Sequence, residues 1–162
     1  YRPYTSCAFK DYEKNIVQDQ GISTFLYVFT ASDTVDEDGY ITGTLLFSIA
    51  NDSEDIDVPV ENPLGNLSQK DLNKLENSSN LYKNYSSKYI EVKCGSTVMQ
   101  AATLGGNSTD GTSPIKPGDT GIVYLVCRLP KDWTSATIRY TMPYDTRKYA
   151  NFIIYPSDSY EG

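Results

Sequence analysis

The chain has 162 residues, a length that suits one domain with a real core and is short for two. It carries 21 acidic and 14 basic residues, so its formal net charge is −7. Nucleic acids and anionic membrane surfaces are therefore disfavoured as partners, because both are bound by basic patches. The complete absence of histidine excludes Ser–His and Cys–His nucleophilic mechanisms and His-ligated zinc.

The sequence contains no membrane-spanning helix, since no apolar run approaches the roughly 20 residues such a helix needs. The longest run, residues 122–127, has the length of a strand. No secretory signal peptide is visible, and the chain begins with Tyr1 rather than Met. We expect a mature or trimmed product whose export signal lies upstream of Tyr1, although an internal domain would look the same.

Seven segments have the alternating pattern or the β-branched and aromatic content of strands. They are residues 22–30, 40–50, 88–94, 97–104, 120–129, 135–142 and 150–155. Turn residues separate them, as at Asp38-Gly39 and at Gly105-Gly106-Asn107.

Alternation within these segments predicts which side chains share a face. In residues 22–30 it places Leu26 and Val28 on one face, and Tyr27 and Phe29 on the other. In residues 40–50 the inward side chains are Ile41, Gly43, Leu45, Phe47 and Ile49. In residues 120–129 they are Val123, Leu125, Cys127 and Leu129.

Residues 67–87 interrupt the strand pattern with a polar stretch. Ser68, followed three residues later by Asp71, is typical of a helix N-cap. We expect one short helix at about 68–76 and a polar loop after it. The whole pattern predicts an all-β sandwich of about seven strands in a single domain over residues 1–162, with residues 1–20 allowed for as an extended N-terminal segment.

Three cysteines without Cys-x-x-Cys spacing cannot by themselves form a standard zinc or iron–sulfur site. Cys94 and Cys127 both fall on the apolar face of their strands, and facing strands of a sandwich bring such faces together. A disulfide between them would close a loop of about 33 residues and stabilise the fold by roughly 3–4 kcal/mol. The alternative is two buried free thiols that pack as small hydrophobes. Cys7, near the N-terminus, has no partner in this pairing.

The stretch TVDEDGYITGTL, residues 34–45, looks like a calcium loop. With Gly39 at the sixth position, Asp36 and Asp38 fit ligand positions, but Leu45 stands where a bidentate glutamate is needed. The flanking segments also alternate as strands, whereas such a loop requires helices. We therefore expect Asp38-Gly39 to form a hairpin turn, and Asp33, Asp36 and Asp38 to offer at most a weak surface cation site.

Residues 115–141, IKPGDTGIVYLVCRLPKDWTSATIRYT, resemble the closing half of the Ig-like domains of Gram-positive bacterial surface lipoproteins, the immunoprotective extracellular group. The matching features are the Pro117-Gly118 turn, the strand that begins at Gly121, the corner at residues 129–132, and Ile138 with Tyr140. Residues 43–58 are similar to the early strand of that family. The resemblance covers about half the chain, and the insertion at residues 67–87 departs from it.

This resemblance implies an Ig-like, extracellular domain, anchored by a lipid upstream of Tyr1, that binds an unknown protein or glycan. It implies no catalytic residue, cofactor or metal. Fourteen tyrosines would suit such a role, because tyrosine makes contacts at low entropic cost. Two sets could form an exposed patch, namely Tyr82, Tyr85 and Tyr89, or Tyr144, Tyr149 and Tyr155. The alternative is that most tyrosines are half-buried strand residues.

Two other classes of function are weaker. A pilin- or adhesin-type structural module with an internal isopeptide bond needs a lysine facing the core, and neither Lys88 nor Lys93 has that placement. A glycosidase needs two carboxylates at the scissile bond, whereas the acidic residues here fall mostly in turns or on polar strand faces.

Glycosylation tripeptides are frequent, beginning at Asn51, Asn66, Asn77, Asn84 and Asn107. In a eukaryotic secreted protein they could carry glycans. We favour an Asn-, Ser- and Thr-rich bacterial surface protein in which these tripeptides have no meaning.

Overall fold

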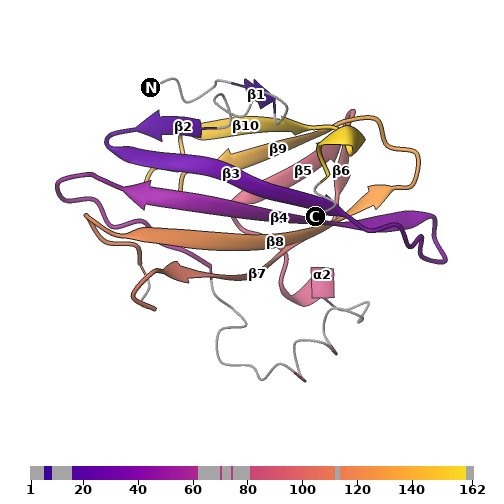
Figure 1. Ribbon diagram of the computed structural model, residues 1–162, viewed down its shortest axis with the longest axis horizontal. Coiled ribbons are helices and arrows are strands. Elements are labelled where there is room, and N and C mark those ends of the chain that lie inside the picture. Colours follow the sequence, from indigo (N-terminus) through magenta and orange to yellow (C-terminus); the bar gives the residue numbers. More distant parts are fainter. Residues whose placement is uncertain are drawn as a thin grey trace.

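The computed structural model describes residues 6–8, 16–61, 70, 74, 81–111 and 114–159, with backbone alone for 6–8 and 158. Its strands form two stacked five-stranded sheets (Figure 1). The prediction of an all-β sandwich with one short helix is confirmed. Among the described residues, no helix combines the length and the apolar character needed to cross a membrane.

One sheet, called here the β4 sheet, has the order β2-β3-β4-β8-β7. Its strands are β2 (Ile16–Asp19), β3 (Ile22–Ala31), β4 (Tyr40–Asn51), β8 (Thr120–Pro130) and β7 (Ala101–Ser108). The other, the β9 sheet, has the order β1-β10-β9-β5-β6. Its strands are β1 (Ser6–Ala8), β10 (Tyr149–Ile154), β9 (Ala136–Thr141), β5 (Ile90–Cys94) and β6 (Thr97–Met99). All pairings are antiparallel except that of β1 with β10.

In the β4 sheet, the predicted inward faces of β4 and β8 are buried against the β9 sheet. Gly43, Leu45, Phe47 and Ile49 are buried on β4, as are all four predicted inward residues of β8. The ring of Phe47 lies edge-on to Tyr140 at a centroid distance of 5.1 Å and to Phe152 at 5.6 Å. Aromatic rings in this arrangement attract each other beyond their burial of area. Phe47 therefore joins the centres of the two sheets.

The predicted faces of β3 are wrong beyond Leu26. The register with β4 shifts between Leu26 and Val28, so Tyr27 is the extra residue of a β-bulge. Alternation then resumes in the opposite sense. Phe29 is fully buried against Trp133, with ring centroids 5.7 Å apart, whereas Tyr27 is 49% exposed.

Residues 97–104, predicted as one strand, divide between the two sheets at Gln100. The turn predicted at Gly105-Gly106-Asn107 is also wrong, because these residues lie inside β7. A Cβ atom on Gly106 would lie 3.0 Å from the carbonyl oxygen of Ile122 and 3.1 Å from that of Glu61. Glycine is needed here for the close approach of neighbouring backbones rather than for a turn.

The helix α2 (Leu81–Asn84) lies within the segment predicted as a polar loop. Of the helix predicted at residues 68–76, Lys70 and Lys74 are helical and the rest lies outside the described residues. Leu81 is 2% exposed and packs with Ala102, Leu104 and Val126 on the outer face of the β4 sheet. This second cluster fixes α2 beside β7 (Figure 1).

Asn51, at the end of β4, is 1% exposed and uses its whole amide. Its Nδ2 donates to the carbonyl oxygens of Ile56 at 2.7 Å and Ile115 at 2.9 Å. Its Oδ1 accepts hydrogen bonds from the backbone N–H and the hydroxyl of Ser53. A buried amide that is fully bonded in this way fixes the chain after β4 in one conformation.

An ion pair between a buried carboxylate and a partly exposed lysine joins the two sheets at one end. Asp19 on β2 is 5% exposed, and its carboxylate accepts from Lys148 Nζ at 3.0 and 3.1 Å. The Tyr144 hydroxyl donates to the same carboxylate at 2.9 Å. Tyr144 and Lys148 both precede β10, so this contact ties β2 to the opposite sheet.

Removing the cation of this pair should destabilise the fold. We expect Lys148→Met to lower the free energy of unfolding by about 2–4 kcal/mol, because a buried carboxylate then loses its counter-ion. The double variant Asp19→Leu/Lys148→Met should recover most of that loss. Urea denaturation measures both, and equal stabilities of the single variant and the wild type would contradict the assignment.

Candidate functional site

The candidate site is a crevice of about 560 Å³ at the place where the chain crosses from β6 to β7. We call it the crevice. Its lining comes from α2, the segment before β5, and strands β5, β6, β7 and β9. The lining residues are Tyr82, Ser86, Ser87, Lys88, Tyr89, Ile90, Glu91, Val98, Met99, Gln100, Ala101, Arg139 and Thr141.

The pleat of β5 and β9 decides which residues of these strands face outward at the crevice. Ile90, Val92, Ile138 and Tyr140 are buried in the core. Successive side chains on a strand point to opposite faces. The residues between them, Glu91 and Arg139, therefore project outward, and the register places the two directly opposite each other.

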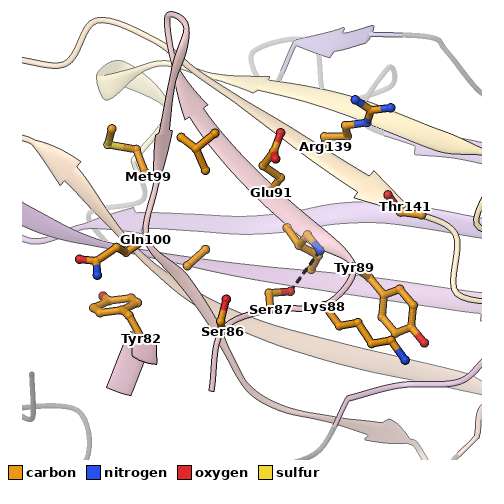
Figure 2. Close-up of a pocket in the computed structure, with 13 residues that line it drawn as sticks. Tyr82, Ser86, Ser87, Lys88, Tyr89, Glu91, Met99, Gln100, Arg139 and Thr141 are labelled. Atoms are coloured by element: carbon orange, nitrogen blue, oxygen red, sulfur yellow. Dashed lines mark hydrogen bonds between the residues drawn. The ribbon is translucent and has the colours of Figure 1, made fainter. Parts of the chain in front are cut away.

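The backbone that enters β5 is fixed by Glu61. Its Oε1 accepts from the N–H groups of Lys88 at 2.8 Å and Tyr89 at 3.2 Å. The Ser87 hydroxyl accepts from the N–H of Ile90 at 3.1 Å, the contact drawn in Figure 2. Two side chains thus satisfy three backbone N–H groups where the chain enters β5, which holds this wall of the crevice rigid.

Two cations of the crevice lining each lie over a tyrosine ring. Lys88 Nζ lies 5.4 Å from the centroid of the Tyr89 ring, and the Arg139 guanidinium carbon lies 3.6 Å from that of Tyr149. Both are cation–π distances. Figure 2 shows Lys88 and Tyr89 at one end of the crevice, with Arg139 and Glu91 at the other.

The opposite wall includes Tyr82 and Gln100 (Figure 2). Burial raises the pKa of Tyr82 to about 12, so its hydroxyl stays protonated and can both donate and accept. Gln100 Oε1 accepts from Arg128 Nη1 at 2.9 Å, which orients the amide. The crevice therefore combines aromatic rings, fixed amide and hydroxyl groups, and charges of both signs.

Several residues of the crevice were not singled out in the sequence. The sequence raises Lys88 only in connection with an isopeptide bond, and it gives no reason to group Arg139, Glu91 and Gln100 in one site. The one local signal is that Arg139 stands between Ile138 and Tyr140 in a predicted strand. This pattern predicts an exposed charge, but it does not predict which other residues lie beside that charge. Lys88 is exposed and Lys93 pairs with Glu91 at 3.7 Å, so neither lysine faces the core.

The two predicted tyrosine patches do not form as such. Tyr82 and Tyr85 are half-buried against the Leu81 cluster, and Tyr89 lines the crevice. Tyr144 is half-buried and holds Asp19. Tyr149 is likewise half-buried under Arg139.

The acidic loop between β3 and β4 is a hairpin turn, as predicted, with Gly39 at a φ of 88°. Asp36 Oδ1 accepts from the N–H groups of Asp38 and Tyr40, and its Oδ2 accepts from Arg128 Nη2 at 2.7 Å. Asp38 also lies 3.5 Å from Arg128. A guanidinium thus occupies the position where a cation would bind. Among the described residues, no group of three potential ligands could hold a metal ion.

A second, larger hollow of about 890 Å³ lies beside this hairpin, and Asp33, Lys131 and Trp133 contribute to it. Among its described lining residues the one aromatic side chain is that of Trp133, which is 8% exposed and packs on Phe29. Its ring is therefore largely committed to the core, whereas the crevice presents two tyrosine side chains. We place the candidate site in the crevice for that reason.

The structure has Cys94 and Cys127 as free thiols on facing sheets, with Cys127 fully buried. Burial raises the pKa of Cys127 to about 12 and also raises that of Cys94. The side chain of Cys7 lies outside the described residues. The disulfide between Cys94 and Cys127 stays a prediction.

Comparison of the chain with models of known protein families, with curated proteins and with solved structures finds no significant match. The site must therefore be interpreted from its own chemistry.

Alkylation should distinguish buried thiols from a disulfide. Only the thiolate reacts, so we expect iodoacetamide at mildly alkaline pH to leave Cys127 unlabelled until the chain is unfolded. If a disulfide forms, labelling of Cys94 and Cys127 will also require a reductant in the denaturant. Peptide mass spectrometry reads both states. Labelling of Cys127 in the folded chain as fast as in the unfolded chain would contradict its burial.

Acid should weaken the hairpin through Asp36. The Tyr40 N–H, followed by Arg128 and the Asp38 N–H, lowers the pKa of this carboxyl below its ordinary 3.8. A lowered folded pKa means that the stabilisation is complete above pH 3.8 and is lost as the pH falls through the folded value. We expect Asp36→Asn to lower the melting temperature at neutral pH and to reduce its dependence on acid. Glu37→Gln in the same loop is the matched control, and identical acid profiles would refute the assignment.

Proposed function

We propose that the chain is a non-enzymatic, extracellular binding module that holds its ligand in the crevice. The observation that supports this proposal is the crevice itself. Ligand sites are hollows of roughly 300–1,000 Å³ in which a few fixed polar groups lie among apolar and aromatic side chains. The crevice has this size, and it sets the Tyr82 and Tyr89 rings among a larger share of polar and charged groups. Its walls are fixed by backbone N–H groups that donate to Glu61 and Ser87, and by Arg128, which donates to Gln100.

A binding role fits the chemistry of the crevice better than catalysis does. The chain has no histidine to act as a base at neutral pH. The nearby acids are engaged, since Glu61 accepts backbone N–H groups and Glu91 lies 3.7 Å from Lys93. A glycosidase would need two carboxylates free to act on one bond.

The cell-surface location rests on the resemblance of residues 115–141 to Ig-like domains of Gram-positive lipoproteins. In that arrangement a lipid upstream of Tyr1 would hold the domain, and an exposed crevice would face a protein or glycan outside the cell. An Ig-like binding module of this kind would use no cofactor.

Blocking the crevice tests the proposal. Ser86 is exposed on its lining, so Ser86→Trp should fill the crevice without disturbing the core. The matched control is Ser157→Trp, in the exposed 3-10 helix Pro156–Asp158 away from the crevice. We expect purified Gram-positive cell walls or immobilised mucin to deplete the labelled wild type and the control from solution.

The Ser86→Trp variant should bind about tenfold more weakly or worse, with an unchanged melting temperature. Binding of Ser86→Trp equal to that of the control would remove the crevice as the site. Failure of the wild type to bind either material would count against the binding module.

A further inference from the structure

We infer that the ligand of the crevice is an acidic glycopolymer, whose carboxylate or phosphate groups bind Arg139 and Lys88. This inference rests on the proposed function and adds the ligand class. Its basis is a pair of cations that have no carboxylate partner among the described residues, in a chain of net charge −7.

Arg139 differs from the other described arginines in what it contacts. Arg128 donates to Asp36 at 2.7 Å, and Arg147 to Asp145 at 3.0 Å. No carboxylate among the described residues lies within ion-pair distance of Arg139, which is exposed. Its described contact is the ring of Tyr149. Within the described part of this acidic chain, Arg139 is thus the arginine whose guanidinium is open to a ligand.

The contact with the Tyr149 ring favours binding of an oxyanion by Arg139. A guanidinium that lies flat on a ring has limited rotation, while its N–H donors project from its edge. That planar edge matches the two oxygens of a carboxylate or phosphate and can bind them in bidentate fashion. The ring of Tyr149 therefore lowers the entropic loss when Arg139 binds.

Lys88 supplies a second cation at the other end of the same crevice. Its ammonium lies near the Tyr89 ring, and no described carboxylate pairs with it. Two separated cations suit a polymer that carries repeated anionic groups better than a single small ion.

Glu91 opposes this preference and makes it testable. It lies across from Arg139 in the β5–β9 register and also lines the crevice. Glu91 forms an ion pair with Lys93 on its own strand, at 3.7 Å. The carboxylate of Glu91 should lower the affinity for an anionic ligand by repulsion, so neutralising Glu91 should strengthen binding.

The rest of the lining favours a polyhydroxylated ligand over an acidic peptide. Ser86, Ser87 and Thr141 carry hydroxyls that can both donate and accept, as sugar hydroxyls do. Tyr82 and Tyr89 add rings with an apolar face and a polar tip. A chain of sugar or polyol units matches both properties.

Calorimetry with four soluble probes tests the inference. They are an oligogalacturonate, a glycerol phosphate oligomer, a neutral maltooligosaccharide of similar length and a polyglutamate peptide. We expect one or both of the first two to bind, with the stronger identifying carboxylate or phosphate as the natural group. Binding should weaken as salt rises from about 0.1 to about 0.5 M, because exposed charges are screened.

Single neutralisations then locate the charges. Arg139→Gln and Lys88→Gln should each weaken binding about tenfold, and Glu91→Gln should strengthen it several-fold. Lys83→Gln and Lys116→Gln, exposed and outside the crevice, should change little and serve as matched controls.

Two results would overturn the ligand class and leave the proposed function intact. One is equal or tighter binding of the neutral oligosaccharide or the peptide, unaffected by Arg139→Gln. The other is no binding of any probe by the wild type, although cell walls or mucin still deplete it from solution and Ser86→Trp still weakens that depletion. Loss of that depletion as well would instead refute the proposed function.

Discussion

The packing of Phe47 between the sheets is the contact on which the arrangement of the crevice depends. Its ring meets Tyr140 on β9 and Phe152 on β10, so these strands can lie only with those residues inward. Because a strand alternates its side chains, Arg139 and Thr141 on either side of Tyr140 must then face outward. A core contact thereby positions the polar wall of a surface site.

The division of residues 97–108 between two sheets supplies the other constraint. A sandwich leaves open edges, and a strand that passes from one sheet to the other turns one of these edges into a corner. Here β6 ends at Met99 and β7 begins at Ala101, so the β5–β6 ladder stops at Val92. The corner would expose β7 and part of β8, but Leu81 and its neighbours cover their outer face. The same corner therefore generates both the crevice and the small cluster beside it.

Much of the fold follows from local pattern, and the departures have identifiable causes. Alternation alone places Leu45 and Leu125 in the core, because β4 and β8 pair without interruption along their length. The bulge at Tyr27 reverses the later part of β3 and leaves no mark in the residue types. Gly106 was predicted in a turn because glycine frees the backbone, whereas here it makes room for a neighbouring strand. Helix α2 is too short to form through propensity and depends on the burial of Leu81. The crevice was not predictable, since its residues come from five separate elements and only register brings them together.

The tripeptide that begins at Asn51 acquires a different meaning from the fold. The side-chain nitrogen that a glycosyltransferase would modify is the same nitrogen that donates to Ile56 and Ile115 inside the protein. A sugar attached there would remove one of its donors and would have no space at a residue that is 1% exposed. Enzymatic transfer to the emerging chain and closure of the sandwich are therefore mutually exclusive at this position. Production in a eukaryotic secretory host would set these two processes in competition for a single atom.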